Sequence, residues 1–200
     1  MSETPAPIPL DDKWVLITGA ARRIGAVVAD TLHAAGANIA IHYRGSVADA
    51  EALQGRLEQR RANSTMLLQG DVLDTAALPD MVARMVAHTG RLDVLINNAS
   101  SFYPTPLGTV TEEQWQDLIG SNLKAPLFLS QAALPHLKAA RGSIINMVDI
   151  HAERPLRDHT VYGPAKAGLV MLTLSLAKDL GPHIRVNGVA PGPSCGPKTA

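Results

Sequence analysis

The chain has little of several features that define common protein classes. Its 200 residues contain one cysteine, Cys195, which excludes an internal disulfide bond and predicts a reducing compartment. Lysines plus arginines and acidic residues both number 18, so the net charge is zero and no overall basicity points to nucleic acid. The first twelve residues hold three prolines and no apolar run, unlike a secretory signal. The most apolar stretch, residues 165–177, is too short to span a bilayer. We therefore expect a cytoplasmic protein without nucleic-acid or membrane partners.

Short apolar runs alternate with segments of helical length, and 46% of the residues are hydrophobic. Strands are expected at residues 14–17, 38–43, 65–69, 92–96, 143–148 and 184–187. Helices are expected at about 23–35, 46–61 with Ser46 as its cap, 75–89, 111–140 and 162–180, with an interruption at Gly120-Ser121. This alternation predicts an α/β fold: one Rossmann-like, doubly wound parallel sheet with helices on both faces. We expect a single domain over 1–200, with a tail at 1–12.

A glycine-bearing turn links the first expected strand to the first helix. It reads Thr18-Gly19-Ala20-Ala21-Arg22-Arg23-Ile24-Gly25. Gly19 permits a sharp turn, and Gly25 permits close backbone approach. The helix N-terminus offers free N–H groups and a positive dipole end to a pyrophosphate. The turn therefore predicts a nucleotide site, and the alternative is an ordinary tight loop with surface arginines.

The end of the second expected strand indicates which nucleotide is favoured. An acidic residue there would bind the ribose diol of NAD, but the chain has Arg44, with Arg22 and Arg23 nearby. Cationic groups accommodate a 2′-phosphate, so NADPH is favoured over NADH. The alternative is that Arg44 is only a solvated loop charge.

Tyr162 and Lys166 lie four residues apart on an expected helix, and Asp149 precedes the tyrosine by thirteen residues. Positions i and i+4 share one helix face, so the phenol and the ammonium can meet. A neighbouring ammonium favours the phenolate, so we expect a lowered pKa for Tyr162 and a proton donor usable near neutral pH. Pro164 requires the helix to begin very near Tyr162.

Together these motifs resemble the short-chain dehydrogenase/reductase family over residues 13–192. The matching residues, in the family's order, are Thr18, Gly19, Ile24, Gly25, Asp71, Val72, Asn97, Asn98, Ala99, Asn122, Tyr162, Lys166, Pro191 and Gly192. The resemblance implies an NADPH cofactor, catalysis by Tyr162 and Lys166, and a water held by Asn122. It also implies cofactor contacts from Asp71 and Val72 at the adenine, from Lys166 at the ribose, and from Asn98, Ala99, Pro191 and Gly192 near the nicotinamide.

Three departures from the common pattern resemble the pteridine reductases. Arg23 replaces the middle glycine, Asp149 replaces a catalytic serine, and one string reads Asn98-Ala99-Ser100-Ser101-Phe102-Tyr103-Pro104. His42, Tyr43 and Ser46 also match the cofactor loop of those enzymes. This resemblance implies that Phe102 stacks a pterin on the nicotinamide, and that Ser100 and Arg23 contact the pterin or cofactor phosphates.

Asp149 discriminates between two reactions. A carboxylate would repel the alkoxide that forms when a carbonyl is reduced, whereas a reduced C=N bond needs a proton on nitrogen. We therefore expect hydride transfer from NADPH to a pterin- or folate-like C=N bond, with Asp149 and Tyr162 relaying the proton. The alternatives are a carbonyl reductase of the same family and a non-catalytic NADP-binding protein. His151, Glu153 and His159 show no repeated ligand spacing, so we expect no metal site.

Residues 193–200 show no structural pattern. A back-translation of this segment, read two bases later, gives a continuation like that of a pteridine reductase. We therefore expect an out-of-frame tail and a truncated chain that lacks the last strand of the family. The resemblance implies that full-length family members are homotetramers that use this strand and a helix, so the oligomeric state of this chain stays open. Sequencing the gene would test the frameshift, and a stop without a downstream homologous frame would exclude it.

Overall fold

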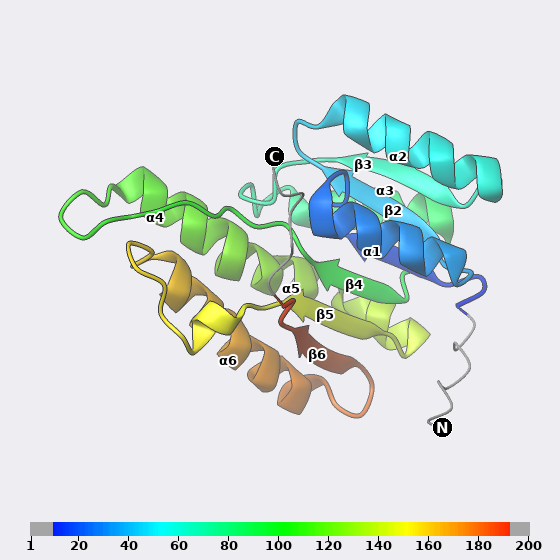
Figure 1. The fold of residues 1–200 in the computed structure, drawn as a ribbon. Coiled ribbons are helices and arrows are strands. Elements are labelled where there is room, and N and C mark those ends of the chain that lie inside the picture. Colours follow the sequence, from blue (N-terminus) through cyan, green and yellow to red (C-terminus); the bar gives the residue numbers. More distant parts are fainter. Residues whose placement is uncertain (1–9, 193–200) are drawn as a thin grey trace, which may run out of the picture.

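The computed structural model describes residues 10–192, which form three layers around one parallel sheet (Figure 1). The strands are β1 (Trp14–Ile17), β2 (Asn38–Tyr43), β3 (Thr65–Gln69), β4 (Val94–Asn97), β5 (Ser143–Met147) and β6 (Arg185–Val189). Their order is β3-β2-β1-β4-β5-β6, and every neighbouring pair is parallel. The predicted doubly wound α/β sheet is confirmed. The two predicted tails, 1–12 and 193–200, lie almost wholly outside the described residues.

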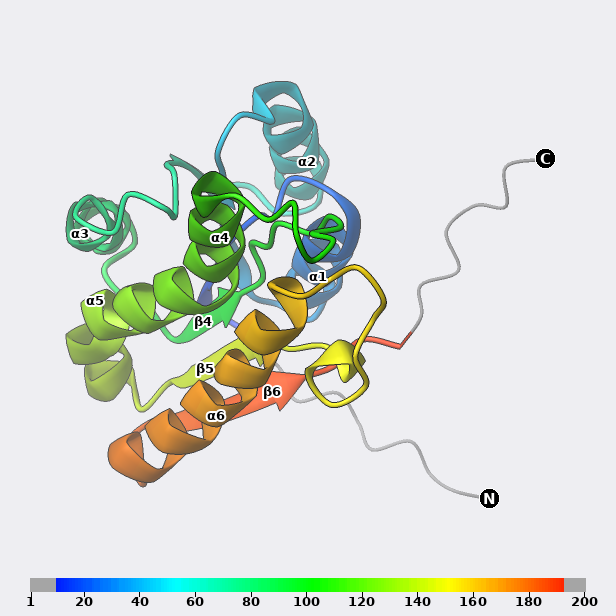
Figure 2. The same cartoon turned by 90° about the vertical axis from the view of Figure 1, so that its left-hand side faces the viewer.

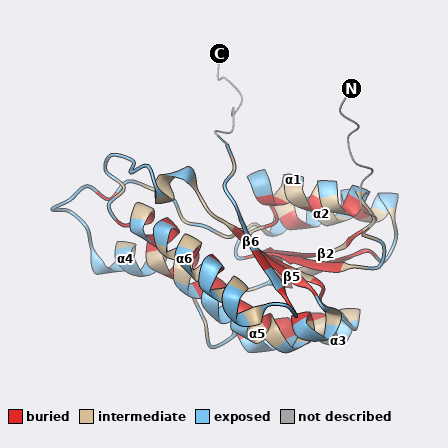
Figure 3. Cartoon of the chain, turned by 90° about the horizontal axis from the view of Figure 1, so that it is seen from below, coloured by how far each residue is buried: buried red, intermediate tan, exposed pale blue. Residues whose placement is uncertain are grey.

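Helices cover both faces of the sheet (Figure 3). They are α1 (Arg23–Ala34), α2 (Val47–Arg60), α3 (Leu78–Thr89), α4 (Glu112–Ile119), α5 (Ala125–Ala140) and α6 (Tyr162–Leu180). α1 and α2 pack on one face, and α3, α5 and α6 pack on the other. Parallel neighbours need a crossover between them, and these helices are the crossovers.

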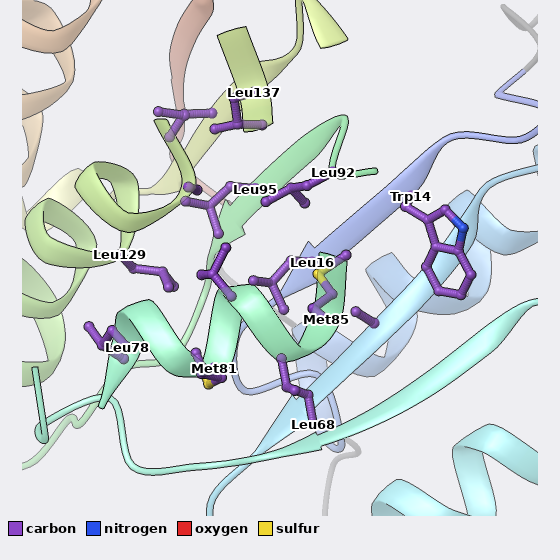
Figure 4. Close-up of a cluster of buried hydrophobic side chains, with 14 of the residues drawn as sticks. Trp14, Leu16, Leu68, Leu78, Met81, Met85, Leu92, Leu95, Leu129 and Leu137 are labelled. Atoms are coloured by element: carbon purple, nitrogen blue, oxygen red, sulfur yellow. The ribbon is translucent and has the colours of Figure 1, made fainter. Parts of the chain in front are cut away.

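The central strands are buried on both faces, which explains their continuous apolar sequence. Leu16 and Leu95 point toward α3 and α5, where they meet Met81, Met85 and Leu129 (Figure 4). The alternate residues of the same strands point toward α1 and α2; the buried apolar set on that side includes Val15, Ile17, Ile39, Ile41, Leu53 and Leu57. A register slip of one residue would move every side chain of a strand to the opposite face of the sheet. The packing of both faces against helices therefore fixes the register, and with it the position at which each strand ends.

Four helix boundaries can be compared with the sequence expectations. α3 begins at Leu78 rather than residue 75, because hydrogen-bonded turns occupy the preceding segment. Ser46 stands at the N-cap position of α2 as expected, but its side chain makes no capping hydrogen bond. The region 111–140 is interrupted where predicted, by the π-helical turn η1 (Gly120–Lys124). α6 begins at Tyr162, so Pro164 falls in its first turn as expected.

Candidate active site

The predicted site residues gather where the strands end at their carboxyl termini. Thr18 follows β1, Asn98 follows β4, Asp149 lies two residues after β5, and Pro191 and Gly192 follow β6. In Figure 2 the segments after β4 (green) and β5 (yellow) run past the end of the sheet toward α4 and α6. The strand order reverses between β1 and β4, and the crevice at such a point is where open α/β sheets bind ligands.

The turn after β1 is shaped by two glycines. Gly19 has a φ of 62°, in the left-handed region that favours glycine. A Cβ on Gly25 would lie 2.4 Å from the Gly19 carbonyl oxygen and 2.7 Å from Asn98 Nδ2. The backbone of the turn therefore packs against the start of α1 as closely as a phosphate cradle requires.

The start of α1 is open. Arg22, the N-cap residue, makes no side-chain hydrogen bond to the first turn, so that turn has no side-chain cap of its own. Arg23 is exposed and has a φ of 50°, a conformation that costs energy for a residue with a side chain. Ile24 is 40% exposed at the same helix end. A helix N-terminus without a side-chain cap is typical of an anion-binding turn.

The end of β4 holds the glycine turn in place. Asn98 Nδ2 donates to the carbonyl oxygens of Thr18 (2.8 Å) and Gly19 (3.1 Å). Thr18 Oγ1 accepts the backbone N–H groups of Asn98 and Ala99, each at 2.9 Å. The structure thus brings together Thr18, Gly19, Asn98 and Ala99 in one hydrogen-bonded unit, in which the Asn98 side chain supports the turn.

His42 and Tyr43 support the turn from below. His42 is 2% exposed, and its Nδ1 accepts the Gly19 N–H at 3.2 Å. Burial lowers the pKa of His42 to about 4, so this imidazole is neutral at pH 7. Tyr43 packs in the apolar cluster beneath α1 and α2. Both side chains are buried, and the place of these residues in the cofactor loop stays a prediction.

Arg44 and Asp71 line a cavity of about 160 Å³ beside the turn. Its other lining residues are Val72, Leu73, Ala99, Ser100, Ser101, Asp117 and Ser121. The Arg44 guanidinium lies 3.7 Å from the Asp71 carboxylate and its side chain is 66% exposed. Arg22 donates instead to Asp49, at 2.6 Å from Nε. Both arginines therefore stay at the open edge of the site, each beside a carboxylate.

Asp149 and Tyr162 are directly hydrogen-bonded. The Tyr162 hydroxyl donates to Asp149 Oδ2 at 2.7 Å, and the His151 N–H fixes Asp149 Oδ1 at 2.9 Å. Burial and the adjacent carboxylate raise the pKa of Tyr162 well above its ordinary value. The predicted lowering of this pKa is wrong, because the phenol is 4% exposed and its partner is the carboxylate rather than the ammonium. The phenol therefore keeps its proton at neutral pH.

Lys166 lies one turn after Tyr162 and beneath its ring. Its Nζ donates to the Met147 carbonyl oxygen at 2.8 Å and lies 5.7 Å from the centre of the Tyr162 ring. Burial lowers the pKa of Lys166 to about 8, and the charge of Asp149 opposes this shift in part. A buried amine with such a pKa next to a carboxylate and a phenol is typical of a catalytic site.

The π-helical turn places Asn122 beside the strand ends. Asn122 is 1% exposed; its Oδ1 accepts the Ser100 hydroxyl at 2.7 Å, and its Nδ2 donates to the carbonyl oxygens of Ser101 and Leu118, each at 2.9 Å. Both hydrogens of the amide are engaged by protein groups, while the amide oxygen keeps a second lone pair. Asn122 therefore fixes the Ser100 loop, and the water that the resemblance implies stays a prediction.

The Phe102 ring packs against Tyr162, next to the hydrogen bond between Tyr162 and Asp149. Its ring centre lies 4.8 Å from that of Tyr162, edge to face, and 4.8 Å from that of His159, stacked with an interplanar angle of 22°. Phe102 is 56% exposed, although its ring already contacts two others. An exposed aromatic face beside a proton donor can accept a flat ring.

Sequence reasoning considered His159 only as a metal ligand and missed Thr105. They meet in an isolated bridge between the loops before α4 and α6, and loop-to-loop contacts leave no periodic signal in sequence. Among residues 10–192 no group of three or more histidine, cysteine or acidic side chains could hold a metal ion, and no helix is long and apolar enough to cross a membrane.

Comparisons with known proteins agree with this geometry. Residues 13–197 match the family model for short chain dehydrogenases. Pteridine reductase 1 of Leishmania tarentolae is 39% identical, over 88% of this chain and 75% of that protein. A 3-oxoacyl-[acyl-carrier-protein] reductase of Staphylococcus aureus is 36% identical, over 90% of this chain and 74% of that protein. The chain belongs to the short chain dehydrogenase family. It is an oxidoreductase of a class that binds NAD(P)H and acts on small molecules.

Proposed function

We propose that this protein is an NADPH-dependent reductase that acts on the C=N bond of a pterin- or folate-like heteroaromatic. The observation that carries the proposal is the 2.7 Å hydrogen bond from Tyr162 to Asp149, beneath the exposed ring of Phe102. The similarity to a pteridine reductase supports the same substrate class.

The residues around the turn fit a dinucleotide phosphate. The Gly19–Gly25 contact leaves no room for a side chain, the first turn of α1 has no side-chain cap, and Arg44 is exposed at the end of β2. We assign the pyrophosphate to this turn, the adenine to the cavity lined by Asp71 and Val72, and a 2′-phosphate to Arg44. Ser46, Arg22 and Arg23 are proposed to complete the phosphate contacts, with Pro191 and Gly192 near the nicotinamide.

Reduction of a C=N bond needs a hydride on carbon and a proton on nitrogen. Bound NADPH would supply the hydride. Tyr162 is protonated at neutral pH and shares its hydrogen with Asp149 Oδ2, so the pair holds a proton at the edge of the slot below Phe102. As the substrate nitrogen gains negative charge, this proton can pass to it, and the Lys166 ammonium stabilises the phenolate left behind. Ser100, held by Asn122, is proposed to orient the substrate.

A second candidate is a carbonyl reductase, favoured by the similarity to a 3-oxoacyl reductase. The position of Asp149 argues against it. Its carboxylate would face the oxygen that becomes an alkoxide, and like charges in a partly buried site destabilise a transition state.

An NADPH oxidation assay with a dihydropterin, dihydrofolate and a 3-oxoacyl thioester separates the candidates. We expect turnover of the pterin or folate. Tyr162→Phe and Asp149→Ala are expected to lower kcat roughly 100-fold or more, with the Kd for NADPH nearly unchanged, because general acid catalysis contributes about 10²–10⁴ in rate. Glu153→Ala, an exposed acid nearby, is the matched control.

Turnover of the thioester alone would establish the second candidate. NADPH binding without any turnover would favour a non-catalytic NADP-binding protein. Equal loss of NADPH affinity and turnover in the two variants would contradict the roles given to Asp149 and Tyr162.

A further inference from the structure

His159 has no part in the proton path, yet its ring is held against the proposed substrate slot. It lies three residues before Tyr162, and its imidazole stacks on Phe102 at 4.8 Å with an interplanar angle of 22°. Its ring centre is 6.5 Å from that of Tyr162. One side of the Phe102 ring is thus covered by an imidazole, while 56% of the residue stays exposed.

The imidazole is anchored by its own loop. Its Nδ1 lies 2.7 Å from the carbonyl oxygen of Arg157, so Nδ1 carries the hydrogen of this bond. Its Nε2 is buried and has no hydrogen-bond partner among the described residues. The ring therefore presents its face to Phe102 and is held there from the backbone.

Thr105 joins the loop of Phe102 to the loop of His159. Thr105 is completely buried; its carbonyl oxygen accepts the Thr160 hydroxyl at 2.7 Å, and its Oγ1 accepts the Val161 N–H at 3.3 Å. The backbone N–H of Thr105 donates to the carbonyl oxygen of Asp158. These bonds bracket His159 on both sides, so the stacked rings belong to one clamped unit that leads directly into Tyr162.

We propose that His159 is a positioning residue that sets the ring plane of Phe102 and thereby favours flat heteroaromatic substrates over non-aromatic ones. This inference rests on the proposed function. An exposed phenylalanine would lose rotational freedom when a ligand stacks on it, and a ring already fixed in the stacking orientation avoids that cost. Aromatic pairs contribute an amount that corresponds to a two- to tenfold change in affinity.

The test compares His159→Ala with His159→Phe, which restores a flat ring. We expect His159→Ala to raise KM for the dihydropterin about two- to tenfold, with kcat within about twofold and an unchanged Kd for NADPH. His159→Phe is expected to restore KM, and His183→Ala, an exposed histidine after α6, to have no effect. A purely structural role would change NADPH affinity or stability and would not be rescued by a ring.

A second measurement needs no substrate. In NMR spectra, stacking on Phe102 is expected to shift the carbon-bound imidazole protons of His159 upfield, and Phe102→Leu is expected to remove that shift. An absent shift overturns the inference, as does an unchanged KM in His159→Ala when the wild-type chain reduces pterins. If the wild-type chain reduces no pterin, the proposed function fails. In that case the Kd of His159→Ala and of His159→Phe for 2,4-diaminoquinazoline, a flat heteroaromatic, is measured with NADP⁺ present. Equal Kd values in the two variants overturn the inference.

Discussion

Lys166 is expected to make folding stability rise with pH. The residue is 4% exposed, and burial lowers the pKa of its amine from the ordinary 10.5 to about 8. The pKa of Lys166 is lower in the folded chain than in the unfolded chain. Protonation of Lys166 therefore lowers folding stability at every pH at which Lys166 of the unfolded chain is protonated. Each pKa unit corresponds to about 1.4 kcal/mol, so the cost is about 3 kcal/mol below pH 8. It disappears as the pH rises from 8 toward 10.5.

Urea unfolding of the wild-type chain and of Lys166→Met, followed by tryptophan fluorescence, measures this cost. Methionine removes the charge and keeps most of the side-chain volume. The difference in unfolding free energy between the two proteins should change by about 2 kcal/mol from pH 7 to pH 10, in the direction that favours the wild type at high pH. Lys178→Met, on the exposed side of the same helix, is the control and should show no such change.

A difference between wild type and Lys166→Met that stays constant with pH would refute the reasoning. It would mean that the folded chain keeps Lys166 charged without penalty. The assignment of Lys166 to the site would then depend only on its bond to Met147 and its position below Tyr162.

Two further substitutions test the turn and the base of the sheet. Gly25→Ala places a Cβ 2.4 Å from a backbone oxygen, so we expect NADPH affinity to fall at least about tenfold by fluorescence titration; Gly55→Ala, which meets nothing within 4 Å, should leave affinity unchanged. Asp93 is buried. Burial alone would raise the pKa of its carboxyl group, but hydrogen bonds from Arg91 and the Trp14 N–H lower it. The stabilisation that these bonds provide is therefore present above the unfolded pKa of Asp93, and it is lost as the pH falls through the folded pKa. Arg91→Met should lower stability at pH 7 by about 1 kcal/mol, because Lys13 and the Trp14 N–H still face the Asp93 carboxylate, and should move acid unfolding to higher pH, in contrast to Arg185→Met at an exposed position; acid unfolding at an unchanged pH would contradict this.

The sheet could be predicted from sequence because burial on both faces leaves continuous apolar runs. Those runs located all six strands to within two residues, and the glycine turn and the Tyr162–Lys166 spacing marked the edge at which the site lies. These signals are local, and each depends on backbone geometry or on a fixed helical period.

The pairing of side chains across the site could not be predicted in the same way. Helical spacing brings Lys166 below Tyr162, but it does not reveal that the amine bonds to Met147 or that the phenol bonds to Asp149. The burial of His42 under the turn depends on how α1 packs on the sheet. The stacking of His159 on Phe102 depends on two loops that meet only in the folded chain.

The hydrogen bond from the Asn98 N–H to Thr18 Oγ1 joins residues 80 positions apart. A growing chain on the ribosome must therefore complete β4 before the phosphate cradle can take its shape, however early β1 and α1 emerge. Contacts between such distant segments form late and slowly. Nucleotide affinity thus shows that β4 has paired with β1. A fragment ending before residue 98 should form helices and strands but should not bind the cofactor.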